Sequence, residues 1–188
     1  MIYLHIYHSY NNIKKSSKSI LLTNLATYLN KKVSEIKLNY NKNGKPEIAG
    51  MNFSISHSKH MMIQAFTLNG NIGVDIEYQN HKRKYLQLAK RYFHPCEHKF
   101  LLSLDGKARI KYFYGLWTAK EAVCKAQGGR LWYYLSENYL VYNNKQKNKK
   151  MAKSIKGLHI NQFEIINEYS LTVATEYQPE GVRYIHEY

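Results

Sequence analysis

The sequence is poor in several residue types, and each shortage narrows what the protein can be. Its 188 residues include two cysteines, Cys96 and Cys124, which are too few for a disulfide framework, so we expect both to be free thiols. The opening segment, residues 1–5, lacks the charged-then-apolar order of a secretion signal, and no apolar run is long enough to span a bilayer. We therefore expect a cytoplasmic protein with no membrane association.

Acidic residues are also scarce, since 13 Asp and Glu stand against 28 Lys and Arg and leave a formal net charge of +15. Strongly basic chains often bind nucleic acid, acidic membranes or acidic partner proteins. However, 23 of the 28 cations are Lys, and Asn and Tyr are abundant as well, a mixture that an A/T-rich genome would also produce. The charge alone therefore does not identify a partner.

The remaining composition suits a folded protein, because 44% apolar and 14% aromatic residues can form a hydrophobic core in one large domain or two small modules. Apolar residues at helical spacing predict a first helix over 19–29. Three short apolar runs then predict strands over 51–56, 61–68 and 72–77. Asn69-Gly70-Asn71 separates the last two runs with residues typical of a hairpin turn, so we expect an antiparallel meander.

The second part of the chain is predicted to be helical first and extended later. Helical patterns cover residues 82–93, 95–104 and 108–127, and Gly128-Gly129 would end the last of them. Strand-like runs follow over 139–142, 159–166, 169–177 and 182–186. The Lys-rich segment 145–156 is expected to be an exposed loop. This order of strands, helices and strands indicates an α+β fold.

The predicted strand 72–77 carries two acidic residues. Side chains alternate along a strand, so Ile72, Val74 and Ile76 would face one side, while Asp75 and Glu77 would face the other, with their Cα atoms roughly 6.6–7 Å apart. Two carboxylates at that spacing can share a hard cation. The solvent-facing side of an ordinary amphipathic strand would look the same, although Asp disfavours strands and the chain has only two Asp residues.

The helix 108–127 places Trp117, Glu121 and Lys125 four residues apart and therefore on one face. Glu followed by Lys at this spacing is also the common surface salt bridge, which contributes only about 0.2–0.5 kcal/mol. The neighbouring residues Trp117, Ala122, Val123 and Ala126 are apolar, which is unusual around a solvent-exposed salt bridge.

The predicted strand over 51–56 alternates Met51, Phe53 and Ile55 and ends in hydroxyls, an imidazole and an ammonium at residues 56–59. Such a cluster can bind a phosphate through hydrogen bonds and charge. A polar hairpin turn is the alternative interpretation.

In this order, Gly44-Lys45-Pro46 and the segments 53–58 (FSISHS), 73–77 (GVDIE) and 117–126 (WTAKEAVCKA) resemble the successive motifs of the 4'-phosphopantetheinyl transferase superfamily. The serine-rich segment precedes the acidic strand, as in the two-module, surfactin-synthetase-activating type. The resemblance implies a monomeric pseudo-dimer of two similar α+β half-modules with antiparallel sheets and the active site between them. The N-terminal half-module, 1–70, would bind the nucleotide of coenzyme A, and the C-terminal half-module, 71–188, would hold the metal and catalytic residues.

The resemblance also implies an activity, namely transfer of the 4'-phosphopantetheine group of coenzyme A to a serine of an apo-acyl or peptidyl carrier protein. Mg²⁺ is the implied cofactor, with Mn²⁺ as an alternative, and 3',5'-ADP is the implied product. The implied metal ligands are Asp75, Glu77 and Glu121, and the implied catalytic residues are Glu121 and Lys125. The implied coenzyme A ligands are Lys18, Lys45, Pro46, Ser56, His57, Lys120 and Lys125.

Two positions depart from the family pattern. The family usually has Asn where this chain has Ser54, and it usually has the second glycine of a Gly-x-Gly-Leu turn where this chain has Arg130. Carrier proteins of the family are generally acidic, so Lys82, Arg83 and Lys84 are candidate docking residues. Two alternatives remain: a basic nucleic-acid-binding module, which salt dependence would separate from a transferase, and a transferase fold without catalysis. No RNP-like or zinc-finger pattern supports the first, and the presence of all the expected carboxylates disfavours the second.

Overall fold

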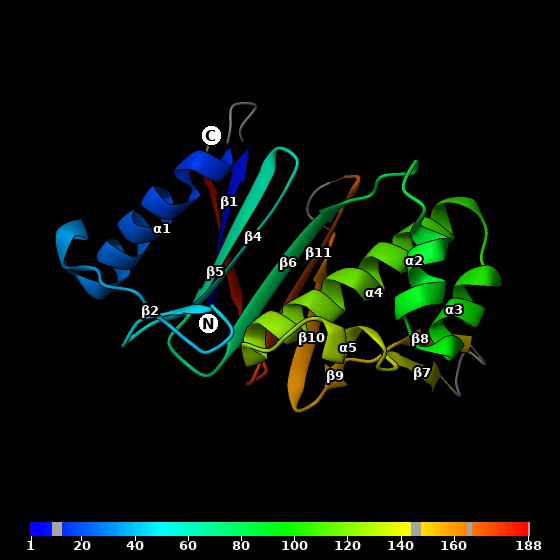
Figure 1. Ribbon diagram of the computed structural model, residues 1–188. Helices are drawn as coiled ribbons and strands as arrows, with labels where there is room; N and C mark the ends of the chain where they lie inside the picture. Colours follow the sequence, from blue (N-terminus) through cyan, green and yellow to red (C-terminus); the bar gives the residue numbers. More distant parts are fainter. Residues whose placement is uncertain (9–12, 144–147, 165–166, 188) are drawn as a thin grey trace.

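The computed structural model describes residues 1–188 except 9–12, 144–147, 165–166 and 188. Over these residues the protein is a mixed α+β structure, as the sequence predicts, and its main elements lie in the order helix, sheet, sheet, helix (Figure 1). In the described part of the chain, no helix is both long and apolar enough to cross a membrane.

The first sheet has the strand order β12-β1-β5-β4. Its strands are β1 (Ile2–His8), β4 (Asn52–Ser58), β5 (Met61–Thr67) and β12 (Val182–Glu187). β1 pairs antiparallel with β5 and parallel with β12, so the last strand of the chain lies beside the first. β4 pairs only with β5 among the described strands and is an edge of this sheet.

Helix α1 (Ile13–Leu29) covers the outer face of the first sheet. Leu21 and Leu25, one turn apart, are buried against Phe53 and Phe66. The helix begins six residues before the predicted start at Ser19, over a Ser- and Lys-rich stretch with little apolar signal.

The second sheet has the order β6-β11-β10-β9 and is antiparallel throughout. Its strands are β6 (Ile72–Tyr78), β9 (Ser154–Ile155), β10 (Leu158–Phe163) and β11 (Tyr169–Thr175). Ile72, Val74 and Ile76 pack with Leu4 and Ile63 of the first sheet. The two sheets therefore share a core, and the face assignment predicted for residues 72–77 is confirmed.

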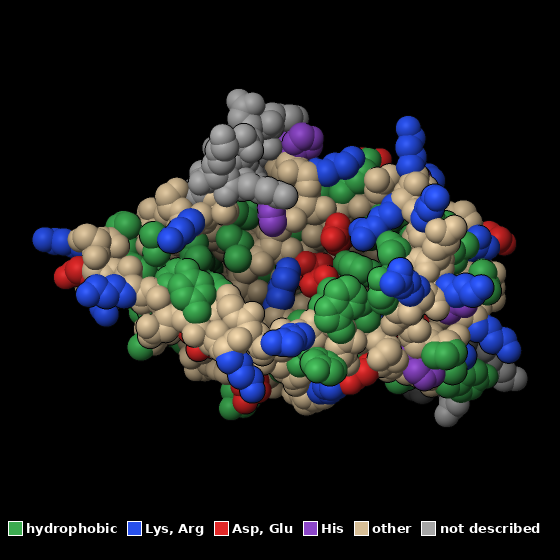
Figure 2. Space-filling view, in the orientation of Figure 1, with side chains coloured by type: hydrophobic (Ala, Val, Ile, Leu, Met, Phe, Trp, Pro, Cys, Tyr) green, Lys and Arg blue, Asp and Glu red, His purple; other side chains and the backbone are tan. Residues whose placement is uncertain are grey.

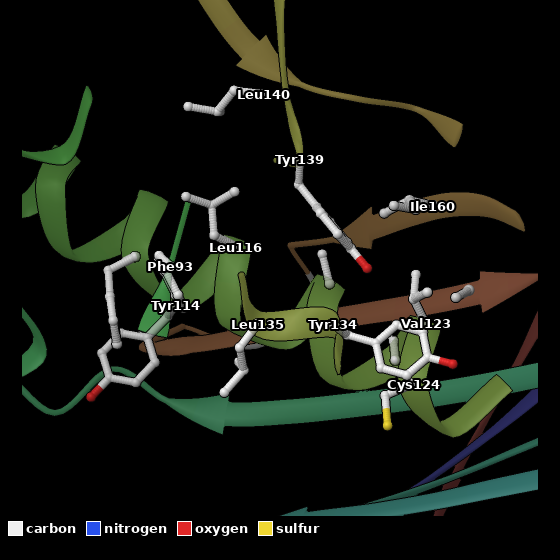
Figure 3. Close-up of a cluster of buried hydrophobic side chains, with 14 of the residues drawn as sticks. Phe93, Tyr114, Leu116, Val123, Cys124, Tyr134, Leu135, Tyr139, Leu140 and Ile160 are labelled. Atoms are coloured by element: carbon white, nitrogen blue, oxygen red, sulfur yellow. The ribbon is translucent and has the colours of Figure 1, made fainter. Parts of the chain in front are cut away.

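Helix α4 (Gly106–Gln127) lies on the other face of the second sheet. Outside it lie α2 (Tyr85–Tyr92), α3 (Pro95–Leu102) and α5 (Trp132–Leu135). Figure 3 shows the core between these helices and the sheet, with Tyr114, Leu116 and Tyr139 among its buried side chains. Gly128, at φ 60°, ends α4 in the left-handed conformation that glycine adopts without strain, as its sequence position predicts.

Smaller elements complete the structure. A 3₁₀ turn, η1 (Val33–Glu35), precedes the short hairpin of β2 (Asn39–Tyr40) and β3 (Pro46–Glu47). A second hairpin joins β7 (Leu140–Asn143) to β8 (Asn148–Met151).

Apart from the start of α1, the predicted strands and helices are found within a few residues of their expected bounds. The predicted antiparallel meander is wrong in one step. β4 and β5 do pair, whereas β6 crosses to the second sheet and pairs with β11. The turn residues 69–71 indicate that the chain reverses there but do not select the next partner. β6 is buried on both faces, one packed against the first sheet and the other against α4. It can be buried in this way only as part of a separate, second sheet.

The prediction that residues 145–156 form a loop is also wrong for the part that the structure describes. β8 and β9 lie within this segment, while residues 145–147 are outside the described residues. β8 is rich in Lys and lacks apolar alternation, so its pairing with β7 rests on the backbone ladder. Predicted strand residues 165–166 also lie outside the described residues.

Candidate active site

The site begins with a close approach between β6 and α4 at Gly73. A Cβ atom there would overlap the carbonyl oxygen of Ala122 and the amide nitrogen of Ala126, both backbone atoms of α4. Because glycine lacks that atom, the strand lies directly against the helix. Asp75 and Glu77 on the strand are thereby brought to the face of α4 that carries Glu121 and Lys125.

Lys125 links the two elements. Its Nζ lies 2.7 Å from Oδ1 of Asp75 and also donates to the carbonyl oxygen of Val74 at 3.2 Å and to the hydroxyl of Ser56 at 3.1 Å. The Asp75 side chain is 6% exposed and the Lys125 side chain 30% exposed, so this ion pair is largely shielded from solvent. Figure 2 shows acidic side chains in a hollow of this face, with basic and hydrophobic side chains around them.

Burial and the charge of Asp75 raise the pKa of two carboxylates at this corner, Glu121 and Glu77. Burial, followed by the negative charge of Asp75 and to a smaller extent that of Glu77, raises the pKa of Glu121 to about 7, while Lys125 opposes the shift. Burial and the charge of Asp75 also raise the pKa of Glu77. Glu121 therefore has a pKa near neutrality, where its carboxylate can accept or release a proton.

Three serines of β4 join this corner to the first sheet. Ser54, Ser56 and Ser58 alternate along the strand and face β6, and we call them the serine seam. Their hydroxyls accept hydrogen bonds from the amides of Val74 (3.0 Å), Ile76 (3.3 Å) and Tyr78 (3.0 Å), respectively. β6 is an edge strand, so these hydroxyls take the place of a neighbouring strand for its outer amides.

The donor set suits a hard divalent cation. Oδ2 of Asp75 is buried without a hydrogen-bond partner, an uncommon state for a carboxylate oxygen and one that a cation would satisfy. Three oxygen-donating carboxylates, Asp75, Glu77 and Glu121, are electrostatically coupled around it. In the described part of the chain, these three carboxylates do not yet form a closed group of metal ligands.

A cavity of about 280 Å³ adjoins this corner at the C-terminal end of α4. Its lining includes Lys45, Pro46, Ser54, Lys125 and Gly128. The β2–β3 hairpin closes one side, because Asn43 donates to the Gly128 carbonyl oxygen at 2.7 Å. Lys45 donates to the carbonyl oxygen of Ala126 at 3.2 Å, and burial lowers its pKa. A larger cavity of about 520 Å³, between α4 and β10–β11, has none of the predicted site residues in its lining.

The sequence profile described as the 4'-phosphopantetheinyl transferase superfamily matches residues 71–174, the stretch that contains β6 and α4. The chain belongs to this superfamily. The matched stretch carries Asp75, Glu77, Glu121 and Lys125, and the family predicted from the sequence is thereby confirmed.

Individual relatives agree. The chain is 40% identical over 109 residues to a putative 4'-phosphopantetheinyl transferase, slr0495, of Synechocystis sp., an alignment that covers 55% of this chain and 44% of the relative. It is 34% identical over 119 residues to the 4'-phosphopantetheinyl transferase HetI of Nostoc sp., covering 60% and 50%. It is 31% identical over 155 residues to the 4'-phosphopantetheinyl transferase Sfp of Bacillus subtilis, covering 79% and 68%. The matches to the first two relatives thus span about half of their lengths.

The structure brings part of the predicted superfamily site together. Lys45, Pro46 and Lys125 border the 280 Å³ cavity. Ser56 lies beside it but is buried in the serine seam, with its hydroxyl donating to Asp75 at 2.8 Å. His57 points to the opposite side of β4 and is exposed, and Lys18 is exposed on α1. The roles of these residues toward coenzyme A stay predictions.

Lys120 of the superfamily motif lies elsewhere. Its side chain is fully buried, with Nζ 3.0 Å from Oε2 of Glu97 and hydrogen-bonded to the Glu137 carbonyl oxygen. The ammonium also lies 4.2 Å from the ring centroid of Tyr139. The predicted contact with coenzyme A would require this buried pair to open.

Arg83, a candidate docking residue from its sequence position, lies beside the acidic corner. Its guanidinium carbon lies 5.0 Å from the ring centroid of Trp117, and its charge lowers the pKa of both Glu77 and Glu121 against the larger effect of burial. The hydroxyl of Tyr114 bonds to the backbone of Asn80, accepting from its amide at 3.1 Å and donating to its carbonyl oxygen at 3.2 Å, which holds this loop against α4. Arg83 sits between two lysines in the sequence, so only the spatial arrangement separates it from them.

Proposed function

We propose that this chain transfers the 4'-phosphopantetheine group of coenzyme A to a serine of an apo-acyl or peptidyl carrier protein and releases 3',5'-ADP. The observation that carries the proposal is the corner of Asp75, Glu77, Glu121 and Lys125, which adjoins a cavity bordered by Lys45 and Pro46. Relatives named as 4'-phosphopantetheinyl transferases, among them Sfp of Bacillus subtilis, support the same reaction.

Asp75, Glu77 and Glu121 are proposed to hold Mg²⁺, or Mn²⁺ in its place. When bound, the ion supplies positive charge that neutralises and orients the pyrophosphate of coenzyme A. The unpartnered Oδ2 of Asp75 supports this assignment.

The chain's own residues are proposed to handle the proton and the developing charge. The carrier serine hydroxyl attacks the phosphorus that bears the pantetheine, and its proton passes to the Glu121 carboxylate, directly or through water. A new serine–phosphorus bond forms as the bond to the leaving 3',5'-ADP oxygen breaks. Lys125, already fixed toward Asp75, would stabilise the negative charge on the phosphates.

The nucleotide is proposed to lie in the 280 Å³ cavity, against Lys45 and Pro46, with the 3'-phosphate at Ser56 and His57 and with Lys18 and Lys120 as further ligands. The arrangement of α1 on one sheet and α4 on the other supports a pseudo-dimer with the site between its halves. The proposed half-modules are 1–70 and 71–188, with β12 of the second completing the sheet of the first. We further propose a cytoplasmic monomer.

The direct test is to incubate the purified chain with coenzyme A, MgCl₂ and an apo-carrier protein and to measure the intact mass of the carrier. A gain of one phosphopantetheine, absent without coenzyme A, is expected. No gain on several apo-carriers that another transferase modifies under the same conditions would overturn the proposal.

A further inference from the structure

The hydrogen bonds of the serine seam have a fixed direction, with the backbone amides of β6 donating and the serine hydroxyls accepting. A serine hydroxyl has one proton to donate and lone pairs to accept with. Each seam hydroxyl accepts from a backbone amide of β6, and an amide can only donate. The hydroxyl proton is therefore left for another acceptor.

For Ser56 and Ser58 that acceptor is a carboxylate of the site. Ser56 donates to Oδ1 of Asp75 at 2.8 Å, and Ser58 donates to Oε2 of Glu77 at 3.1 Å. Ser54 bonds the amide of Val74 in the same way, but no carboxylate is among its bonds in the described part of the chain. The seam thus contains two serines that orient carboxylates and one that serves only the backbone.

Each of these bonds occupies one oxygen of its carboxylate and leaves the other. In Asp75 the occupied atom is Oδ1, which also accepts from Lys125, and the remaining Oδ2 is buried without a partner. In Glu77 the occupied atom is Oε2. A carboxylate held by one oxygen cannot rotate freely, so its second oxygen keeps a constant direction.

We propose that Ser56 and Ser58 are positioning residues that hold Asp75 and Glu77 with their second oxygens directed toward a divalent cation. The inference rests on the proposed function for the identity of that cation. It also assigns Ser56 to the carboxylates, in addition to the phosphate role expected from the sequence. Because the seam belongs to the first sheet and the carboxylates to the second, the cation site depends on contact between the two sheets.

The test uses Mn²⁺ alone as the probe, with the full chain and without coenzyme A, because Ser54 also borders the cavity. Bound and free Mn²⁺ are measured by electron paramagnetic resonance during a titration of wild type, Ser58→Ala and Ser54→Ala. Ser58 is preferred to Ser56 because Ser56 also contacts Lys125. Ser54→Ala is the matched control, since it removes the same hydroxyl and the same kind of amide contact from the same strand.

Loss of the group that orients a metal ligand typically weakens metal affinity about 10- to 100-fold, and we expect Ser58→Ala to do so. Ser54→Ala should leave the Mn²⁺ dissociation constant within about 2-fold of wild type, and Ser58→Thr, which keeps a hydroxyl, should restore binding. Chemical unfolding of all variants shows whether each one is folded. If Ser58→Ala is not, Ser56→Ala takes its place in the titration, because it removes the hydroxyl that donates to Asp75.

The inference would be overturned by equal Mn²⁺ affinity in Ser58→Ala and Ser54→Ala. It would also be overturned if the wild-type chain bound no Mn²⁺. The carrier mass assay separates this failure from that of the proposed function. A wild-type chain that modifies the carrier while both serine variants bind Mn²⁺ equally refutes only the seam. A chain that binds Mn²⁺ with the expected serine dependence but modifies no carrier refutes only the transferase proposal.

Discussion

Lys120 of α4 and Glu97 of α3 form an ion pair at 3.0 Å in which neither side chain is exposed to solvent. Glu97 also accepts from the backbone amides of Tyr139 at 2.7 Å and His94 at 3.2 Å, so it ties the entry to β7 and the start of α3 to the middle of α4. Burial raises the pKa of Glu97 and lowers that of Lys120, and each charge opposes the shift of the other. Glu121, the next residue along α4, is therefore anchored through its neighbour.

Removal of the Lys120 charge should destabilise the protein strongly. Breaking a buried pair leaves an uncompensated buried charge, which costs about 3–5 kcal/mol, so Lys120→Met should lower the free energy of unfolding by about that much in a denaturant titration. The double variant Lys120→Met, Glu97→Gln should recover part of the loss. A Lys120→Met protein that is as stable as wild type but binds coenzyme A weakly would instead support the phosphate role predicted from the sequence.

Gly73→Ala should disrupt the contact of β6 with α4. The new methyl group would meet backbone atoms of Ala122 and Ala126, which cannot move aside as a side-chain end can, and overpacking of this kind costs about 1–3 kcal/mol or more. Gly115→Ala in α4 is the matched control, because its methyl group would meet mainly the end of the Gln162 side chain. Thermal unfolding that is equally affected in both variants would contradict the close-contact argument.

Chelation and carboxylate replacement should abolish carrier modification. We expect EDTA to stop the reaction, and Asp75→Asn and Glu121→Gln each to lower the rate by about 10²-fold or more while the protein remains folded. Glu77→Gln should cost less, because water can replace one ligand of Mg²⁺. Full activity of Glu121→Gln in the presence of Mg²⁺ would refute both its metal and its proton-accepting roles.

His57→Ala should distinguish coenzyme A from dephospho-coenzyme A. A charged hydrogen bond to phosphate contributes roughly 1.5–3 kcal/mol, so the dissociation constant for coenzyme A should rise about 10- to 100-fold, with little change for the dephospho compound. Isothermal titration calorimetry with both ligands measures the difference. Equal weakening for both would place the 3'-phosphate away from His57.

Carrier affinity should fall as salt rises, because attraction between a basic enzyme and an acidic carrier is screened over about 8–10 Å at physiological ionic strength. Lys82 and Lys84 are exposed, whereas Arg83 is half-buried over Trp117, so the surface test is Lys82→Glu with Lys84→Glu. This variant should raise the KM for the carrier and leave kcat and the KM for coenzyme A nearly unchanged. A salt-independent KM would favour genomic bias as the origin of the net charge.

The features that sequence reasoning predicted correctly are local ones. Alternation placed Ile72, Val74 and Ile76 on the opposite side of β6 from Asp75 and Glu77, and helical spacing placed Glu121 and Lys125 on one face of α4. Each of these patterns depends on the backbone geometry of a single strand or helix over a few residues. That geometry is the same whatever the rest of the chain packs against.

The features that it missed depend on partners far away in the chain. The turn at Gly70 does not reveal that β6 will pair with β11, because that choice is made by the faces that need burial. The neighbours of Ser56 in the sequence predict a phosphate ligand, but its contact with Asp75 exists only once the two sheets pack. Lys120 and Arg83 are likewise separated from the other cations by their surroundings alone.

The parallel pairing of β1 with β12 sets an order for biosynthesis. Residues 2–7 are synthesised well before their partners, residues 182–187. Until then one edge of β1 has no strand beside it, and unpaired strand edges readily associate with other chains. The first sheet can therefore be completed only after synthesis has passed β12, and until then a nascent chain of this protein exposes that edge of β1.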